Sequence, residues 1–275
     1  MYSKNYSKGV FLNIISKDKN DWKRQVNFIN SLLNVNHVEV WIEENIAEPE
    51  LKFLKSLLKK YEILVHGPFT HLSLISPHKE IREITVKLYL QTLKISEMLE
   101  AKLVTFHCGT KLKFTSQEVA PKLLTQHFRK IKKCYKGKIP FTIENLPAEE
   151  RGVQIHYPTF LLDLIDLKKQ ISWLNFSLDI GHAFQNGDGL NKISEFLKKY
   201  RDSILDIHLQ DANLKGKAHL ALGAGELDLI KFLKFLRKIQ YKGYLTLETI
   251  TLEDTKFSWE KLFAIEQKLN RQKIL

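Results

Sequence analysis

The feature that most constrains the fold is a repeated alternation of strand-like runs with amphipathic helical segments. Eight runs rich in β-branched and aromatic residues lie at positions 10–15, 38–42, 63–66, 103–107, 140–144, 176–179, 204–208 and 244–248. Most are nearly continuous in apolar residues, as is typical of strands buried on both faces. Between them, segments such as 49–61 and 227–239 place leucine and phenylalanine largely on one helical face. This alternation predicts an α/β fold, a closed (β/α)₈ TIM barrel, with an open doubly wound sheet as the alternative.

Local signals also predict where two of the helices begin. Asp21 precedes Trp22 at the start of one amphipathic segment, and Thr115-Ser116-Gln117-Glu118 has the spacing of a capping box. Each signal predicts a helix start at or directly after those residues.

Length and composition favour one domain. The chain has 275 residues, 44% of them hydrophobic, which is typical of one barrel and enough to bury a large core. No segment resembles a flexible linker or a low-complexity tract, and no glycine-rich dinucleotide fingerprint follows a strand. We therefore expect a single domain spanning residues 1–275.

The sequence predicts a cytoplasmic protein with no membrane partner. Lys4 and Lys8 precede the apolar run at 10–15, as in a signal peptide, but that run is short and no small-residue cleavage site follows it. No stretch approaches the roughly 20 apolar residues of a membrane span. The two cysteines, Cys108 and Cys134, are too few for a disulfide framework, which fits a reducing compartment.

The net charge of +12 favours anionic partners such as nucleic acid, phosphorylated metabolites or membrane surfaces. Several lysine pairs, however, fall near the ends of predicted helices, where cations complement the helix dipole. They are Lys59-Lys60, Lys132-Lys133, Lys168-Lys169 and Lys198-Lys199. Because they form no single stripe, the distribution favours solvated outer helix faces.

Ionisable residues stand at the carboxyl ends of six predicted strands. They are His66, His107, Glu144, Asp179, His208 and Glu248, with His182 three residues after Asp179. The carboxyl ends of the strands of a parallel barrel open onto one face, where active sites lie. Three converging carboxylates would repel one another unless a cation neutralised them. Mixed nitrogen and oxygen ligands suit Zn²⁺, Mn²⁺, Fe²⁺ or Co²⁺ better than Ca²⁺, with Mg²⁺ left open.

In order and spacing, these segments resemble the xylose isomerase-like metal-dependent barrels, which include sugar-phosphate isomerases and epimerases and endonuclease IV. The matching segments are HGPF at 66–69, FHCG at 106–109, IEN at 143–145, LDIGH at 178–182, HLQD at 208–211, His219, LGAGELD at 222–228 and LE at 247–248. The resemblance implies a principal metal held by Glu144, Asp179, His208 and Glu248. It also implies a second metal position near His66 and His107, bridged by Glu144.

The sequence departs from endonuclease IV at the third metal position of that enzyme. His182 and His219 match its two histidines, but Lys217 stands where an aspartate is expected, and an ammonium group cannot ligate a metal. The residues at 43–47 are also too few to build its DNA-probing loop. The resemblance places the turn at 223–225 beside the substrate, although such a turn also serves as a plain helix entry.

Several other residues near these segments are interpreted as packing residues, and one has two possible roles. Phe69 could match an aromatic wedge, but packing at the barrel mouth is favoured. The four tryptophans (Trp22, Trp41, Trp173 and Trp259) are expected to pack in the core or between helices and barrel, and Cys108 is expected to pack while pointing away from the barrel interior. Asn145 either orients Glu144 or contacts substrate.

These residues predict a divalent-metal-dependent isomerase or epimerase for a sugar or sugar phosphate. Glu144 and Glu248 would exchange the carbon-bound proton while the metal stabilises an enediolate. Substrate would be held by His182, Asn145, Lys217 and His219, the last two at a distal anionic group. The alternatives are a phosphodiesterase for abasic DNA, with nucleic acid the less favoured partner, and a barrel that binds a ligand without turnover.

Overall fold

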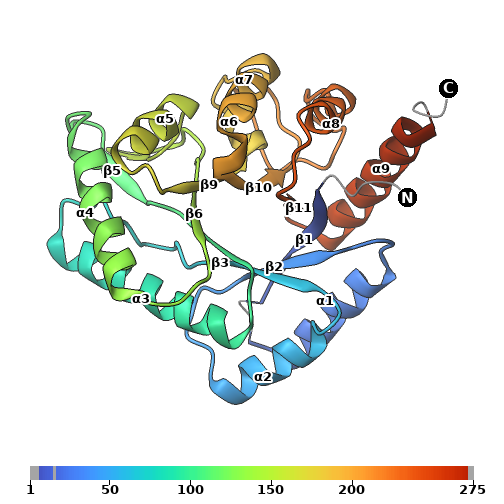
Figure 1. The fold of residues 1–275 in the computed structure, drawn as a ribbon, viewed down its shortest axis with the longest axis horizontal. Helices are drawn as coiled ribbons and strands as arrows, with labels where there is room; N and C mark the ends of the chain where they lie inside the picture. The colour runs from blue at the N-terminus through green and yellow to red at the C-terminus, as the bar shows by residue number, and fades with distance from the viewer. Residues whose placement is uncertain (1–5, 15–16, 272–275) are drawn as a thin grey trace.

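The computed structural model describes residues 6–14 and 17–271 and contains a closed parallel barrel of eight strands (Figure 1). The barrel strands are β1 (Ser7–Asn13), β2 (His37–Trp41), β3 (Glu62–His66), β4 (Leu103–Phe106), β6 (Phe141–Glu144), β9 (Asn175–Asp179), β10 (Ile204–Leu209) and β11 (Tyr244–Leu247). Each pairs with its neighbour along the chain, and β11 pairs with β1. The (β/α)₈ prediction is confirmed, and the open sheet is excluded. Residue 15, the predicted end of the first strand, lies outside the described residues.

Helices cover the outside of the barrel (Figure 1). They are α1 (Lys19–Ser31), α2 (Glu48–Leu57), α3 (Lys79–Met98), α4 (Val119–Cys134), α5 (Leu161–Gln170), α6 (Ile180–Gln185), α7 (Leu190–Tyr200), α8 (Leu229–Lys238) and α9 (Leu252–Arg271), with a 3₁₀ turn at Arg201–Ser203. Helix α9 also contacts the residue that precedes β1, because Tyr6 Oη donates a hydrogen bond to Glu266 Oε1 over 2.9 Å. Among the described residues, no helix is both long and apolar enough to cross a membrane.

Both predicted helix starts need correction. Helix α1 begins at Lys19 because Asp18, not Asp21, is its N-cap and accepts a hydrogen bond from the Asn20 amide. The Thr115–Glu118 segment is not a capping box. The Thr115 amide bonds the Leu112 carbonyl in a turn, and α4 begins at Val119 without a side-chain cap.

The barrel strands are apolar on their outer face and carry many polar residues on their inner face, which corrects the expectation of nearly continuous apolar runs. In β2, Val38 and Val40 belong to the hydrophobic core, whereas the alternating His37 and Glu39 are buried polar residues. Strand β9 repeats the pattern, with buried Ser177 alternating with core residues. Because successive side chains of a strand point to opposite faces, the polar set lies on the inside of the barrel. The barrel interior therefore contains a polar set together with apolar residues such as Leu64 and Leu103.

A small antiparallel sheet was not foreseen. It consists of β5 (Thr110–Leu112), β8 (Gln154–His156) and β7 (Glu150–Arg151), built from the segments that follow β4 and β6. Strands of two or three residues are too short to show a period of two in the sequence. Since it follows the carboxyl ends of β4 and β6, the sheet forms a wall on the face where the ionisable residues lie.

The first prediction concerns the room that Gly9 leaves inside the barrel. A Cβ at Gly9 would collide with the His37 ring and carbonyl. We expect Gly9→Ala to lower the free energy of unfolding by about 1–3 kcal/mol, as overpacking does, measured by urea denaturation. Gly189→Ala is the control, because a Cβ there meets nothing within 4 Å. Equal stability of the two variants would contradict the crowding described for the barrel interior.

Candidate metal centre

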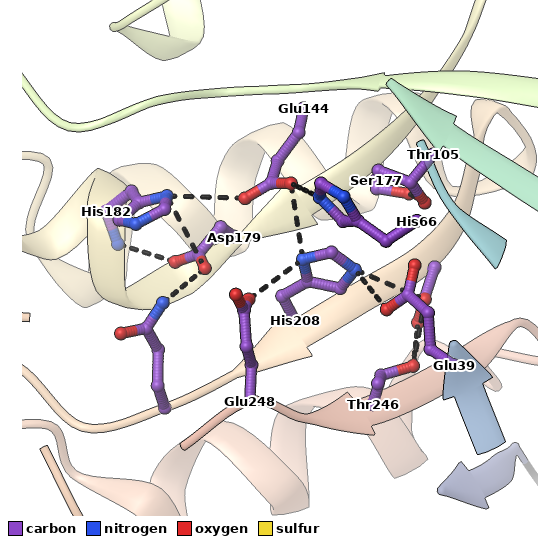
Figure 2. A network of polar contacts seen from close by, with 12 residues as sticks. Glu39, His66, Thr105, Glu144, Ser177, Asp179, His182, His208, Thr246 and Glu248 are labelled. Atoms are coloured by element: carbon purple, nitrogen blue, oxygen red, sulfur yellow. Dashed lines mark hydrogen bonds and ion pairs between the residues drawn. The ribbon is translucent and has the colours of Figure 1, made fainter. Parts of the chain in front are cut away.

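Four of the predicted ligands come together at the carboxyl ends of the strands (Figure 2). Glu144 and Asp179 end β6 and β9, His208 lies near the end of β10, and Glu248 directly follows β11. One ligand atom from each of these residues lies within 4.8 Å of the others. Glu144, Asp179 and His208 are buried, and the Glu248 side chain is 16% exposed. The structure therefore brings together donors from four strands in a geometry that one cation could fill.

His66 and His107 form a second group with Glu144. Their Nε2 atoms lie 3.3 and 3.2 Å from Glu144 Oε2, and 3.2 Å from each other. Glu144 thus belongs to both groups, as the family resemblance implies. The three ligand atoms satisfy the same 4.8 Å criterion.

The charges of this cluster are poorly compensated by the protein itself. Burial, with the nearby Glu248 and Glu144, raises the pKa of Asp179 to about 6. Burial would also raise the pKa of Glu144, but the imidazoles of His208 and His107 lower it well below its usual range. The pKa of Glu248 falls to about 2 because a hydrogen-bonding interaction with His208 outweighs burial. Imidazoles hold these carboxylates ionised. A divalent cation bound at the cluster would take over that role from the imidazoles.

Unpartnered atoms supply an independent test of the fit. The buried Glu144 Oε1, Glu248 Oε2 and His208 Nδ1 make ion-pair contacts of 3.1–3.4 Å but no hydrogen bond of acceptable geometry. A buried polar atom without a hydrogen bond is costly. A cation bound among these atoms would remove that cost, so the donor set fits a divalent metal.

The predicted substrate-binding residues lie in different settings. His182 Nε2 is 3.1 Å from His219 Nε2, beside the cluster and on the same pocket. Lys217 is exposed and lines that pocket as well. Asn145 is fully buried, and its amide exchanges two hydrogen bonds with the Asp179 backbone, at 2.8 and 2.9 Å. For Asn145, this favours positioning of the strand ends over contact with substrate.

An aromatic wall lines the pocket above the cluster. Trp41 stacks on Phe69 with ring centroids 4.8 Å apart, and Phe69 stacks on His107 at 4.5 Å. Both residues line a cavity of about 1010 Å³, so the expectation that they only pack in the core or at the barrel mouth is corrected. Glu43 holds the wall in place. It accepts hydrogen bonds from Trp41 Nε1, at 3.0 Å, and from the amides of Phe69 and Thr70, at 3.2 and 2.8 Å.

The glycine turn at 223–225 does not border the pocket. Asp211 organises it, accepting hydrogen bonds from the amides of Gly223 and Leu227. None of residues 223–225 lines the cavity. The turn therefore serves as a helix entry before α8, and the idea that it lies beside the substrate is not supported.

Several polar residues around the cluster were missed by the sequence analysis. Gln210 donates to Asp179 and accepts from the His219 amide. Glu39 lies inside the barrel, on the far side of His208 from Glu144 (Figure 2). Asp206 approaches the same ring nitrogen as Glu39, whereas Glu144 lies by the other nitrogen. Their alternation with apolar residues in β2 and β10 was the available signal, and a search confined to strand ends does not find it.

With the fold and the cluster described, the chain can be compared with known proteins. The profile of the xylose isomerase-like TIM barrel family matches residues 27–270. The chain belongs to this family. A crystal structure of a D-tagatose 3-epimerase-like protein superposes on it with a TM-score of 0.79, at 24% identity, over 97% of this chain and 99% of the other.

Two sequence relatives are also similar over most of their length. An uncharacterized protein of Methanocaldococcus jannaschii is 28% identical over 229 residues, covering 79% of this chain and 75% of the relative. A probable endonuclease 4 of Campylobacter concisus is 24% identical over 252 residues, covering 85% and 87%. The sequence similarity thus extends to a protein described as a probable endonuclease 4, and the structural similarity shows a shared fold.

The raised pKa of Asp179 predicts how metal binding depends on pH. Below its pKa of about 6 this carboxyl gains a proton and is lost as a ligand. We expect the affinity for Mn²⁺ to fall more steeply with pH once the pH drops through 6. Asp179 then binds a proton in addition to the one that competes at His208, whose pKa burial would lower but Glu39 and Glu144 raise well above its usual range. Calorimetric titration between pH 7.5 and 5 measures this fall, with circular dichroism confirming that the fold persists. A pH dependence of the same steepness above and below pH 6 would contradict the assignment of Asp179 as a ligand.

Proposed function

We propose that this chain is a divalent-metal-dependent isomerase or epimerase acting on a sugar or sugar phosphate. The observation that carries the proposal is the convergence of Glu144, Asp179, His208 and Glu248, of which Glu248 lines an aromatic-walled cavity. A pocket with one apolar wall and a few convergent polar groups is the usual form of a small-molecule site. The similarity to a D-tagatose 3-epimerase-like structure supports a ketose as the substrate class.

The chemistry would be proton transfer at a carbon next to a carbonyl group. When bound, a divalent metal would supply Lewis-acid stabilisation of the negative charge that develops on the substrate oxygens. Glu144 and Glu248 come from opposite parts of the barrel, β6 and the end of β11. One carboxylate would remove the proton from carbon, leaving an enediolate, and the other would return a proton to it. A lowered pKa keeps the carboxylate that acts as the base ionised at neutral pH, and the other carboxylate must first gain a proton from water before it can return one.

Other residues would bind and orient the sugar. His182 borders both the cluster and the cavity, so it would donate a hydrogen bond to a substrate oxygen. Burial would lower its pKa, but Asp179 and Glu144 raise that pKa to about 9, which keeps the ring a donor. The stacked rings of Trp41 and Phe69 offer a flat apolar surface for the C–H face of a sugar.

A second candidate function is cleavage of abasic DNA. The group formed by His66, His107 and Glu144 supports it, because two neighbouring metals suit phosphoryl chemistry. The relative described as a probable endonuclease 4 and the basic net charge point the same way. Two features favour the sugar proposal instead. Lys217 stands where the endonuclease has a ligating aspartate, and the segment at 43–47 is short.

One experiment separates these functions. Metal-loaded protein is incubated in deuterated water with a panel of ketoses and ketose phosphates, and separately with an abasic duplex. We expect deuterium to enter the ketose at the exchanged carbon, and Glu144→Gln to abolish this exchange while the protein stays folded. Gel analysis of the duplex tests cleavage. Cleavage without exchange would replace the proposal, and neither reaction would favour a ligand-binding barrel.

Lys217 yields a prediction about the substrate. If its ammonium holds a distal phosphate or carboxylate, Lys217→Ala should raise KM for the anionic substrate about tenfold to a hundredfold and leave a neutral analogue nearly unchanged. Lys234→Ala, an exposed lysine on the outer helix α8, is the matched control. An equal effect of Lys217→Ala on charged and neutral substrates would remove the anion-binding role while leaving the metal centre untouched.

A further inference from the structure

The barrel interior beneath the candidate metal centre contains two carboxylates that the proposed reaction does not use. Glu39 on β2 and Asp206 on β10 are both fully buried. Glu39 Oε2 lies 3.0 Å from His208 Nε2, and Asp206 Oδ2 lies 3.5 Å from the same atom. Figure 2 shows Glu39 on one side of the His208 ring, with Glu144 and Glu248 on the other. Asp206 lies on the Glu39 side, because it approaches the same ring nitrogen.

The two nitrogens of His208 thus face different partners. Nδ1 lies 3.1 Å from Glu248 Oε2 and 3.4 Å from Glu144 Oε2, on the side of the metal cluster. Nε2 faces only the buried carboxylates among the contacts described. A neutral imidazole carries its proton on one nitrogen and a lone pair on the other. The carboxylate of Glu39, at ion-pair distance from Nε2 although not in hydrogen-bond geometry, therefore favours a proton there and leaves the Nδ1 lone pair free for a metal.

We propose that Glu39, assisted by Asp206, is a positioning residue that fixes the tautomer and the ring orientation of His208 for metal binding. The inference rests on the proposed metal centre and adds two residues that do not themselves contact metal or substrate. A carboxylate that accepts the second N–H of a ligating histidine also increases the basicity of the ligand.

His208 is the ion-pair partner of Glu39 among the described residues. The two side-chain oxygens of Glu39 make no hydrogen bond of acceptable geometry. Burying an ionised carboxylate is costly unless it is paired, and an apolar residue of similar size would avoid that cost. The neighbouring outward positions, Val38 and Val40, show that the strand itself tolerates apolar residues.

Asp206 is anchored by a chain of hydrogen bonds that runs down the barrel. Thr246 Oγ1 donates to Asp206 and lies 2.9 Å from His37 Nε2, and His37 Nδ1 lies 3.0 Å from Ser7 Oγ. The Ile207 amide also donates to Asp206 Oδ1 over 2.7 Å. Asp206 is thereby fixed, which leaves Glu39 as the closer and less constrained partner of His208.

Substitution of Glu39 should weaken metal binding without removing any ligand. Glu39→Leu removes the acceptor, and we expect the Kd for Mn²⁺ to rise about tenfold to a hundredfold. Glu39→Gln keeps a neutral acceptor of nearly the same shape, so it should give a smaller rise. Ser177→Ala is the matched control. Ser177 is also buried and polar inside the barrel, but it bonds Thr105 and Thr142 and makes no described contact with the metal cluster.

Mn²⁺ titrations followed by electron paramagnetic resonance compare the four proteins, and circular dichroism verifies their folding. If Glu39→Leu does not fold, the near-isosteric Glu39→Gln decides. In Zn²⁺-loaded wild-type protein labelled with ¹⁵N-histidine, His208 should carry its proton on Nε2. Equal Kd values for wild type and the Glu39 variants, or a proton on Nδ1, would overturn the inference.

The same measurements separate this inference from the proposed function. A wild-type protein that binds Mn²⁺ but exchanges no ketose proton would refute the isomerase proposal, and weaker binding by the Glu39 variants would still support the positioning role. A wild-type protein that binds no divalent metal at all would overturn both.

Discussion

The constraint on which the rest of the structure depends is the burial of several carboxylates inside a closed barrel. Glu39, Glu144, Asp179 and Asp206 are all nearly or completely buried among the inward-facing positions. Such carboxylates are tolerated only when paired. His208 lies between the two halves of this set, with one nitrogen toward each, so its ring links the cluster at the barrel mouth to the buried pair beneath it. A divalent cation at the mouth would supply the positive charge that the imidazoles alone provide here.

The site is held by short hydrogen-bonded connections between strand ends, because the residues concerned are far apart in sequence. Asn145 joins the end of β6 to the end of β9 through the Asp179 backbone. Glu43 joins β2 to the segment after β3, which fixes the aromatic wall of the pocket. Residues without a direct chemical role thus decide where the reactive carboxylates and the substrate surface lie. This is the usual division of labour in a barrel, where the scaffold is rigid and loops carry the specificity.

Much of the site could be predicted from sequence because two simple rules combine. Parallel strands of a barrel open onto one face, and ionisable residues at the ends of apolar runs are rare without a reason. Glu144, Asp179, His208 and Glu248 were found this way, and the structure brings them together. Glu39 and Trp41 were not found. The alternation in β2 does not say which set of residues faces the inside of the barrel. In sequence, a polar residue that points into the barrel looks the same as a polar residue that points into solvent.

The sequence by itself determined the number and order of the barrel units and the residue types at the strand ends, because strand periodicity and strand–helix alternation are local properties. Only the tertiary structure decided which of these residues share a charge cluster, that Trp41 lines the cavity rather than the core, and that Asn145 bonds a neighbouring strand. These outcomes depend on strand register and on the closure of β11 against β1. The pairing of β11 with β10, of β10 with β9 and of β9 with β6 brings ligand atoms of Glu248 and Glu144 within 4.8 Å, which no local pattern encodes.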